Sequence, residues 1–167
     1  GGSMLDGKRV AILIAPKFHE EETTIPRDFL VSNNATVELI GLDESSVPGK
    51  VNKFSLTPDL TIADAEVDNY DAVIIPGGGA PECLRINENI LEFIKQFWTT
   101  GKPIAAICHG PQVLISAQVL EGVTLTSYVG IRDDVLNVGA KWVDQAVCVD
   151  GQLITSRTPD DLDIFNK

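Results

Sequence analysis

A cysteine followed directly by a histidine and a glycine is the part of this sequence best suited to chemistry. Cys108, His109 and Gly110 come after the apolar run Ile104–Ile107, and a helical pattern begins at Pro111. Cysteine attacks electrophiles as the thiolate, and a strand-to-helix junction is one place where a fold can lower the pKa of a thiol. The stretch is similar to the sharp turn that carries the nucleophile of many α/β enzymes, with Cys in place of Ser. We therefore predict a cysteine-dependent enzyme.

Each of these two residues also has a plainer interpretation. A free cysteine at a strand end is often a small buried residue, and a histidine in the first turn of a helix is often exposed to solvent. Here the two are adjacent and a glycine turn follows, which a core position does not need. We interpret Cys108 as the nucleophile and His109 as its base and proton carrier.

Two other predicted strands also end in unusual residues. Phe18 to Glu22 follows the first strand, and Gly77, Gly78 and Gly79 follow the third. In parallel sheets, ligands bind beyond the carboxyl ends of the strands, so these segments and the cysteine are predicted to form one site. The glycine amides, with the amide of His109, could form an oxyanion hole, and the alternative is an ordinary tight turn.

The charged cluster from His19 to Glu22 is expected to be mostly solvated, because a charge run usually is. One carboxylate directed at the strand ends would still matter. An ionised carboxylate beside Cys108 would raise the pKa of the thiol, so a helpful one must be protonated and donate a hydrogen bond. The residues alone leave open which of the acids this is.

The elements that must position these residues alternate along the chain. Strands alternating with helices predict an α/β three-layer sandwich, in which a mostly parallel, flavodoxin-like sheet has helices on both faces. A small hairpin excursion is expected at 48–58, and a second hairpin at 143–155 around Asp150-Gly151. The expected strands are 8–15, 36–42, 72–75, 104–107 and 123–128, and the expected helices are 25–32 with Pro26 in its first turn, 87–100, 111–120 and 131–138.

Length and composition are ordinary for a single soluble domain. The chain has 167 residues, of which 44% are hydrophobic. We expect one domain over 4–167, preceded by a cloning scar at 1–3. No apolar run approaches the roughly 18 residues that span a bilayer, so we expect no membrane partner and a cytoplasmic location.

Charge and cysteine content exclude other classes. The net charge of −11 and the lack of a Lys/Arg cluster argue against nucleic acid binding. Three cysteines without a CxxC pair, and only two histidines, make a zinc cage hard to assemble. We therefore expect free thiols, no metal and no cofactor.

The sequence resembles the ThiJ/PfpI superfamily, which contains the PfpI-type intracellular peptidases and the parkinsonism-associated protein deglycase. The resemblance covers almost all of 8–166. Four motifs carry it in order: Pro76–Glu82 (PGGGAPE), Ala106–Gln112 (AICHGPQ), Ser127–Ile131 (SYVGI) and Thr155–Asp161 (TSRTPDD).

The resemblance implies roles for particular residues. Cys108 falls on the nucleophile and His109 on its partner. Glu22 falls on a buried glutamic acid that hydrogen-bonds the reactive sulfur and is thought to be protonated. Glu82 falls on the acid that, in PfpI-type assemblies, reaches the histidine of a neighbouring subunit. The resemblance thus implies a homodimer or homohexamer whose active site is completed between subunits.

It also implies the surroundings of the nucleophile. Gly78 and the backbone after Cys108 match the oxyanion hole, and Tyr128 lies near the pocket. His19 stands where relatives usually place another acid, so the placement of protons around Glu22 is expected to differ here.

The leading interpretation is a stress-response enzyme that acts on reactive carbonyls, of the glyoxalase III or protein deglycase type. Its substrates would be small carbonyl compounds or glycated proteins and peptides. The alternatives are a PfpI-type cysteine peptidase and a redox-sensing chaperone in which Cys108 oxidises to a sulfinate. A glutaminase-type amidotransferase fits less well, because no histidine follows His109.

Overall fold

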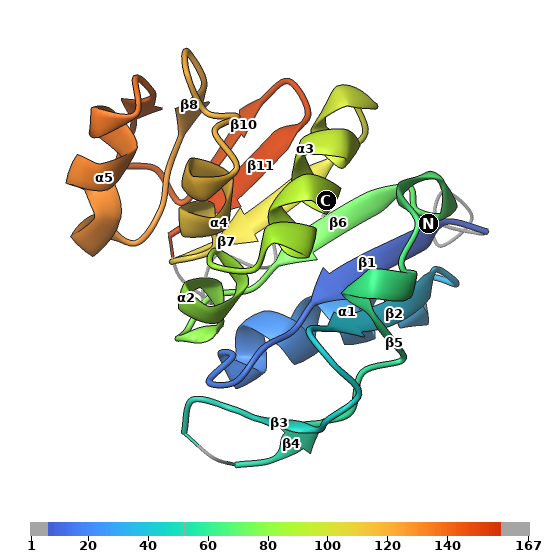
Figure 1. Ribbon diagram of the computed structural model, residues 1–167. Helices are drawn as coiled ribbons and strands as arrows, with labels where there is room; N and C mark the ends of the chain where they lie inside the picture. The colour runs from blue at the N-terminus through green and yellow to red at the C-terminus, as the bar shows by residue number, and fades with distance from the viewer. Residues whose placement is uncertain (1–6, 52, 158–167) are drawn as a thin grey trace.

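A seven-stranded sheet forms the centre of the computed structural model, which describes residues 7–51 and 53–157. The strand order is β10-β11-β7-β6-β1-β2-β5, and all neighbours are parallel except β10 and β11 (Figure 1). This confirms the predicted α/β sheet. Its strands are β1 (Arg9–Leu13), β2 (Thr36–Gly41), β5 (Leu60–Thr61), β6 (Ala72–Ile75), β7 (Ile104–Ile107), β10 (Val147–Asp150) and β11 (Leu153–Ser156).

The direction in which the chain builds the sheet reverses beside β1. From β1 the chain moves outward to β2 on one side, and from β6 it moves to β7 and then to β11 on the other. A crevice forms beyond the carboxyl ends of the strands at such a point, and ligands bind there. The ends of β1, β6 and β7, which carry the predicted site, lie at or next to this point.

Helices cover both faces of the sheet. Crossover connections between parallel strands are right-handed. The connection from β1 to β2 therefore places α1 (Glu20–Ser32) on one face, and the later connections place α2 (Ala80–Leu84), α3 (Glu88–Thr99) and α4 (Pro111–Ser116) on the other (Figure 1). Strand β1 is covered on both faces, and its residues Ala11, Ile12 and Leu13 have no exposed surface.

Helix α3 follows the predicted pattern closely. Ile90, Ile94 and Phe97 point into the core with no exposed surface, and the Asn87 side chain caps the helix by accepting a hydrogen bond from the Ile90 N–H at 3.1 Å. An apolar stripe and a good cap residue are both visible in the sequence, so the predicted bounds hold to within one residue.

The prediction for α1 was wrong at its start. The helix begins at Glu20 rather than near Ile25, because His19 acts as its N-cap and the three following acids occupy its first turn. Acidic residues in the first turn complement the helix dipole. Pro26 therefore lies inside the helix and not in its first turn, so no N–H is available there to donate to the Glu22 carbonyl.

Two other predicted elements are shorter than expected. The strand predicted at 123–128 is reduced to β8 (Thr124–Leu125), which pairs in parallel with β9 (Lys141–Trp142) outside the main sheet. The helix predicted through Leu120 ends at Ser116, and Gln118 has a positive φ of 62° that ends helical geometry. Helix α5 (Arg132–Asn137) lies within its predicted range.

Both predicted hairpins are present. The excursion consists of β3 (Val47–Pro48) and β4 (Ser55–Leu56), paired antiparallel, and β10 pairs with β11 across a turn at Gly151, where φ is 58°. No sequence pattern predicted β5, α2 or the short 3₁₀ turns Ile62–Asp64, Val67–Asn69 and Val129–Ile131. Residues 158–161 of the fourth motif lie outside the described residues.

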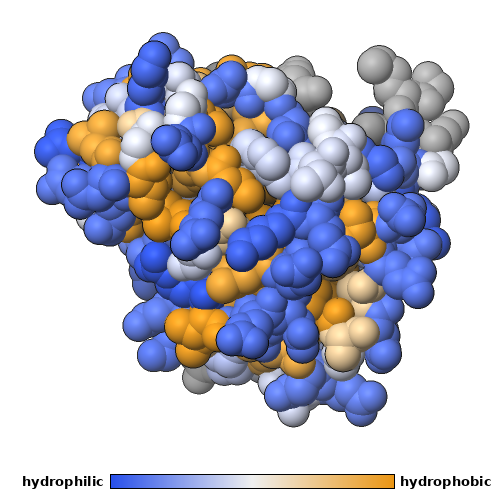
Figure 2. Space-filling view, turned by 45° about the horizontal axis from the view of Figure 1, so that its top comes forward, coloured by the Kyte–Doolittle hydropathy of each residue, from blue (hydrophilic) through white to orange (hydrophobic). Residues whose placement is uncertain are grey.

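Hydrophilic side chains dominate the face seen in Figure 2, with apolar patches between them. This surface agrees with the net charge of −11. None of the helices in the described parts of the chain has the length and apolar character needed to cross a membrane.

Candidate active site

Cys108 lies on a sharp turn directly after β7. Its φ is 57°, in the left-handed region that a non-glycine residue rarely adopts. Two hydrogen bonds hold this conformation: the Cys108 N–H donates to the Ser156 carbonyl at 2.9 Å, and the Cys108 carbonyl accepts from the Tyr128 N–H at 2.9 Å. The positive φ costs about 1–2 kcal/mol, and these two hydrogen bonds to neighbouring segments offset that cost. The sharp turn after β7 agrees with the sequence prediction, and the role of Cys108 as a nucleophile stays a prediction.

Gly110 allows the turn to pack against the sheet. A methyl group at this position would lie 2.5 Å from the Ile75 carbonyl oxygen and 3.0 Å from that of Ile107. A side chain has no room at this position, because Gly110 packs directly against the ends of β6 and β7.

His109 is placed to exchange a proton with the cysteine. Its Nδ1 lies 3.3 Å from the Cys108 Sγ, and its ring lies against the Tyr128 ring with 4.6 Å between centroids. Burial lowers the pKa of His109, and the nearby charge of Lys50 lowers it further. The imidazole is therefore neutral at pH 7 and can accept the proton of the thiol.

Glu22 is the carboxylate that approaches the strand ends. It has no exposed surface, and its Oε1 accepts a 2.7 Å hydrogen bond from the Gly77 N–H, while Oε2 has no hydrogen-bond partner within 7–51 and 53–157. A methyl group at Gly77 would touch Glu22 Oε1 and lie 3.1 Å from the Cβ of Cys108. Helix α1, the glycine turn and the nucleophile thus meet at one point.

Burial dominates the protonation of this pair. It raises the pKa of Glu22 to about 7, against the effect of the Gly77 N–H. Burial also raises the pKa of Cys108 to about 12; the ionised form of Glu22 adds to this, and the His109 N–H and Lys50 oppose it. The expectation that the turn lowers the thiol pKa is therefore wrong, because desolvation outweighs the local dipoles. Protonation of Glu22 would remove one of the two causes that raise the pKa of Cys108.

The glycine turn uses two of its three amides inside the fold. The Gly77 N–H donates to Glu22, and the Gly79 N–H donates to the Lys17 carbonyl at 2.7 Å. Gly78 has a φ of 75°, and a methyl group there would lie 2.6 Å from backbone atoms of Lys17 and His19. Among the described residues the Gly78 N–H makes no hydrogen bond. An oxyanion hole at this turn would therefore rest on Gly78.

His19 is part of the framework of the site. It is half-buried, its Nδ1 accepts from the Glu22 N–H at 3.3 Å, and the same Nδ1 lies 3.9 Å from Glu22 Oε2. Burial is the main cause that lowers the pKa of His19. An Nδ1 that accepts a hydrogen bond carries no proton, so His19 caps α1 in its neutral form.

Replacing His19 by alanine is expected to lower the free energy of unfolding by about 1 kcal/mol through loss of the N-cap. His19→Asn keeps an acceptor at this position and is expected to recover most of the loss. Urea denaturation of the three proteins checks this. Equal stability of the alanine and asparagine variants would contradict a capping role.

Tyr128 lies at the rim of the site, and Glu82 lies on the surface. Besides contacting His109, Tyr128 borders a pocket of about 460 Å³ that is also lined by Arg132 and Trp142. The Trp142 indole donates to Ser127 Oγ at 3.0 Å, which fixes this wall. Glu82 is exposed in the first turn of α2 and makes no hydrogen bond or ion pair to any other described residue.

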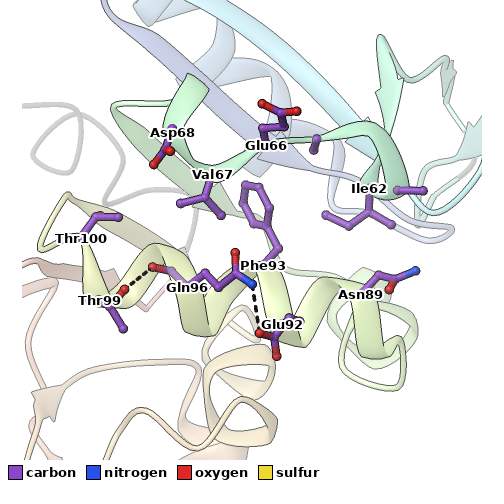
Figure 3. A pocket seen from close by; sticks show the side chains of 12 residues that line it. Ile62, Glu66, Val67, Asp68, Asn89, Glu92, Phe93, Gln96, Thr99 and Thr100 are labelled. Atoms are coloured by element: carbon purple, nitrogen blue, oxygen red, sulfur yellow. Dashed lines mark hydrogen bonds between the residues drawn. The ribbon is translucent and has the colours of Figure 1, made fainter.

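A larger groove, of about 620 Å³, runs along α3 away from these residues (Figure 3). Phe93 and Val67 form its apolar part, while Glu66, Asp68 and Glu92 give it acidic edges. It contains no cysteine or histidine. The candidate active site is therefore the smaller region around Cys108.

Residues 8–167 match the family described as the DJ-1/PfpI family. This chain belongs to the DJ-1/PfpI family. Deglycase PfpI of Pyrococcus furiosus is 42% identical over 154 residues, which cover 92% of each chain. Protein/nucleic acid deglycase 2 of Escherichia coli is 42% identical over 162 residues, covering 96% of this chain and 94% of that protein. These names support an enzyme of the DJ-1/PfpI family.

A solved structure shows the same fold within a larger protein. A two-domain protein of Anabaena variabilis, with DJ-1/ThiJ/PfpI-like and ferritin-like domains, matches with a TM-score of 0.93 and 41% identity. The match covers 95% of this chain and 46% of that one, so this DJ-1/PfpI chain spans about half of the two-domain protein.

Sequence reasoning missed two residues near the site. Glu20, expected among the solvated acids, is only 5% exposed and bonds the backbone of the β3–β4 hairpin. The exposed Lys50 of that hairpin places its charge near Cys108, His109 and Glu22. Gly49, before the lysine, was the available signal, since glycine often marks a close approach.

Proposed function

We propose that this protein is a thiol-dependent deglycase that acts on reactive carbonyl compounds and on their early adducts with amines. The observation that carries the proposal is the 3.3 Å contact between Cys108 Sγ and His109 Nδ1, on a strained turn beside a buried carboxyl group. The deglycase names of the relatives support the same class of substrate.

The reaction begins with transfer of the thiol proton to His109 or Glu22. The sulfur adds to the aldehyde carbon of a 2-oxoaldehyde, and the carbonyl oxygen takes up a proton to give a hemithioacetal. In an early adduct the same carbon carries a hydroxyl group and the amine. The sulfur replaces the amine there: the C–N bond breaks, the nitrogen leaves with a proton, and the same hemithioacetal results. A proton then moves from the former aldehyde carbon to the neighbouring ketone carbon through an enediol, which gives a thioester of a 2-hydroxy acid. Water hydrolyses the thioester, and the thiol is regenerated.

The proposal assigns a group near the turn to each step. Neutral His109 accepts and returns protons at Nδ1, and protonated Glu22 offers a second proton carrier at Oε2. The Gly78 N–H, which has no partner among the described residues, is proposed to stabilise the developing oxyanion. Small molecules and proteins are proposed as carriers of the adduct in preference to nucleic acid, because the net charge of −11 opposes a polyanion.

The test uses the wild-type protein with methylglyoxal and with its adduct on N-acetylarginine. We expect lactate in both assays, and free N-acetylarginine in the second in equal amount. Acid quenching followed by peptide mapping is expected to find the acyl group on Cys108 and not on Cys83, a partly exposed free cysteine. Absence of lactate, or equal labelling of the two cysteines, would overturn the proposal.

Glu82 is proposed to complete the site from a neighbouring copy of the chain. With Nδ1 of His109 facing the sulfur, Nε2 is the ring nitrogen left for a carboxylate. Glu82→Gln is expected to lower kcat about tenfold, because the imidazole loses the group that orients it. Glu88→Gln, an exposed acid in the first turn of α3, is the matched control.

Mixed oligomers decide whether Glu82 acts between subunits. An oligomer of Glu82→Gln and Cys108→Ala chains pairs an intact Cys108 with an intact Glu82 from the other chain. Size-exclusion chromatography with a lactate assay is expected to show partly restored activity in the mixture. Failure to restore activity in a demonstrated mixed oligomer would contradict the arrangement.

A further inference from the structure

The β3–β4 hairpin is fastened to the edge of the active site. The Lys50 N–H donates to the Phe18 carbonyl at 2.7 Å, and the Lys17 N–H donates to the Pro48 carbonyl at 2.8 Å. On its other side the segment 17–19 bonds the glycine turn, through His19 to Gly77 and Gly79 to Lys17. Segments 48–50, 17–19 and 77–79 therefore lie side by side, with Lys50 one segment away from the glycine turn.

The side chain of Glu20 binds the backbone of this hairpin. Its carboxylate is 5% exposed and accepts hydrogen bonds from the N–H groups of Val51 at 3.4 Å and Lys53 at 3.2 Å. A methyl group at Gly49 would collide with the same carboxylate. Burial by itself raises the pKa of Glu20, but the backbone donors outweigh it and the net shift is downward, so the carboxylate is ionised.

Lys50 brings a positive charge to a strongly acidic protein. The backbone of Gly49 and Lys50 lies beside Phe18, which itself lies beside Gly78 at the glycine turn. In agreement with this position, the charge of Lys50 lowers the pKa values of Glu22, His109, Cys108 and His19. Lys53, on the same hairpin, acts only on His19 among these groups. Of the two hairpin lysines, Lys50 alone thus contributes positive charge at the sulfur.

We propose that Lys50 forms an anion subsite beside Cys108, selecting carbonyl substrates that carry a carboxylate or phosphate near the reacting carbon, and that Glu20 is the positioning residue that seats it. The substrate class rests on the proposed function, whereas the anion subsite itself does not. The 2-hydroxy acid product also carries a carboxylate, which the same ammonium group would stabilise as it forms.

Two alkylating reagents that differ in charge test the subsite. Iodoacetate is an anion and iodoacetamide is neutral, and both react with the same sulfur, so the ratio of their rates at Cys108 reports the local potential. Lys50→Gln is expected to lower this ratio about fivefold at low salt. Lys50→Arg should restore it, and Lys53→Gln should leave it unchanged. An unchanged ratio in Lys50→Gln would overturn the proposal.

Glu20→Gln distinguishes positioning from simple electrostatics. Removing a negative charge near the site would by itself raise the rate with iodoacetate relative to the rate with iodoacetamide. Glu21→Gln, which changes an exposed neighbouring acid, is expected to show this rise. If Glu20 seats the hairpin, the ratio falls instead, because Lys50 moves away. Gly49→Ala keeps every charge but displaces the hairpin, and a fall is expected there too. A rise in Glu20→Gln, or no fall in Gly49→Ala, would overturn the role of Glu20.

Turnover then tests the substrate class. The anionic substrate is 4,5-dioxopentanoate, a 2-oxoaldehyde that carries a carboxylate and would give 2-hydroxyglutarate. Its comparison with neutral methylglyoxal is expected to show that Lys50→Gln raises KM for the anion about fivefold with little change in kcat. Equal effects on the two substrates would overturn the selection. Loss of all turnover in the wild type, together with the expected alkylation ratios, would overturn the proposed function and leave the anion subsite in place.

Discussion

Replacement of Cys108 by alanine is expected to lower lactate formation from methylglyoxal by at least about a thousandfold. The sulfur is the only atom of the proposed mechanism that bonds to the substrate carbon, and neither His109 nor Glu22 can take over that step. The fold should survive the change, because alanine keeps the hydrogen bonds of the turn, which are made by the backbone of residue 108. Activity is measured as lactate, and folding by circular dichroism.

The control for this variant is Cys83→Ala. Cys83 lies in α2, is partly exposed and contacts none of the reacting groups, so its replacement should leave the rate unchanged. A Cys108→Ala protein that keeps a tenth or more of the wild-type rate would show that the sulfur is not the nucleophile. In that case His109 and Glu22 would have to act on the aldehyde as an acid–base pair alone.

The strands that flank the site were predictable because their signals are local. Segments 72–75 and 104–107 are uninterrupted apolar runs bounded by Pro and Gly, which is what a strand buried on both faces requires. Their bounds in the structure are the predicted ones. The convergence of Cys108, His109 and the glycine turn followed from topology alone, since parallel strands place their carboxyl ends at one edge.

The acidic cluster could not be resolved in the same way. Glu20 and Glu22 are buried because backbone N–H groups far along the chain meet them: Gly77 for Glu22, and Val51 and Lys53 for Glu20. A charge run contains no sign of such partners. The direction of the Cys108 pKa shift was missed for a related reason, since the dipoles of a turn are local while desolvation depends on everything packed around it.

The predicted strand at 123–128 shows how side chains can divert backbone donors. The Thr126 N–H donates to Thr155 Oγ1 at 3.0 Å, and the Tyr128 N–H donates to the Cys108 carbonyl. These donors are therefore not available to a neighbouring strand, and pairing stops after Leu125. Tyr128, one of the residues lost from the strand, thus helps to hold the turn at Cys108.

Glu22→Gln is expected to make the protein more stable and less active at the same time. The folded-state pKa of Glu22 is raised to about 7, above the ordinary value of 4.5. Its neutral form is therefore the stable one in the fold, and this stability is complete below pH 4.5 and is lost as the pH rises through 7. At pH 8 the ionised carboxylate costs about 3 kcal/mol, which Gln avoids while keeping the acceptor for Gly77.

Chemical denaturation at two pH values measures this effect. The free energy of unfolding of Glu22→Gln should exceed that of the wild type by about 2–3 kcal/mol at pH 8, and by little at pH 4.5. Glu21→Gln, an exposed acid one residue away, should show no such difference. An equal or lower stability of Glu22→Gln at pH 8 would mean that the buried carboxylate is not ionised at a cost.

The chemistry of the same variant separates two roles of Glu22. Ionised Glu22 raises the pKa of Cys108, so Gln should leave alkylation by iodoacetamide at pH 8 as fast as in the wild type or faster. Turnover should nevertheless fall about a hundredfold, because an amide cannot carry a proton between sulfur and substrate. If alkylation and turnover fell together, Glu22 would serve to form the thiolate. Loss of turnover alone would identify it as the proton carrier of the site, retained although it destabilises the fold at neutral pH.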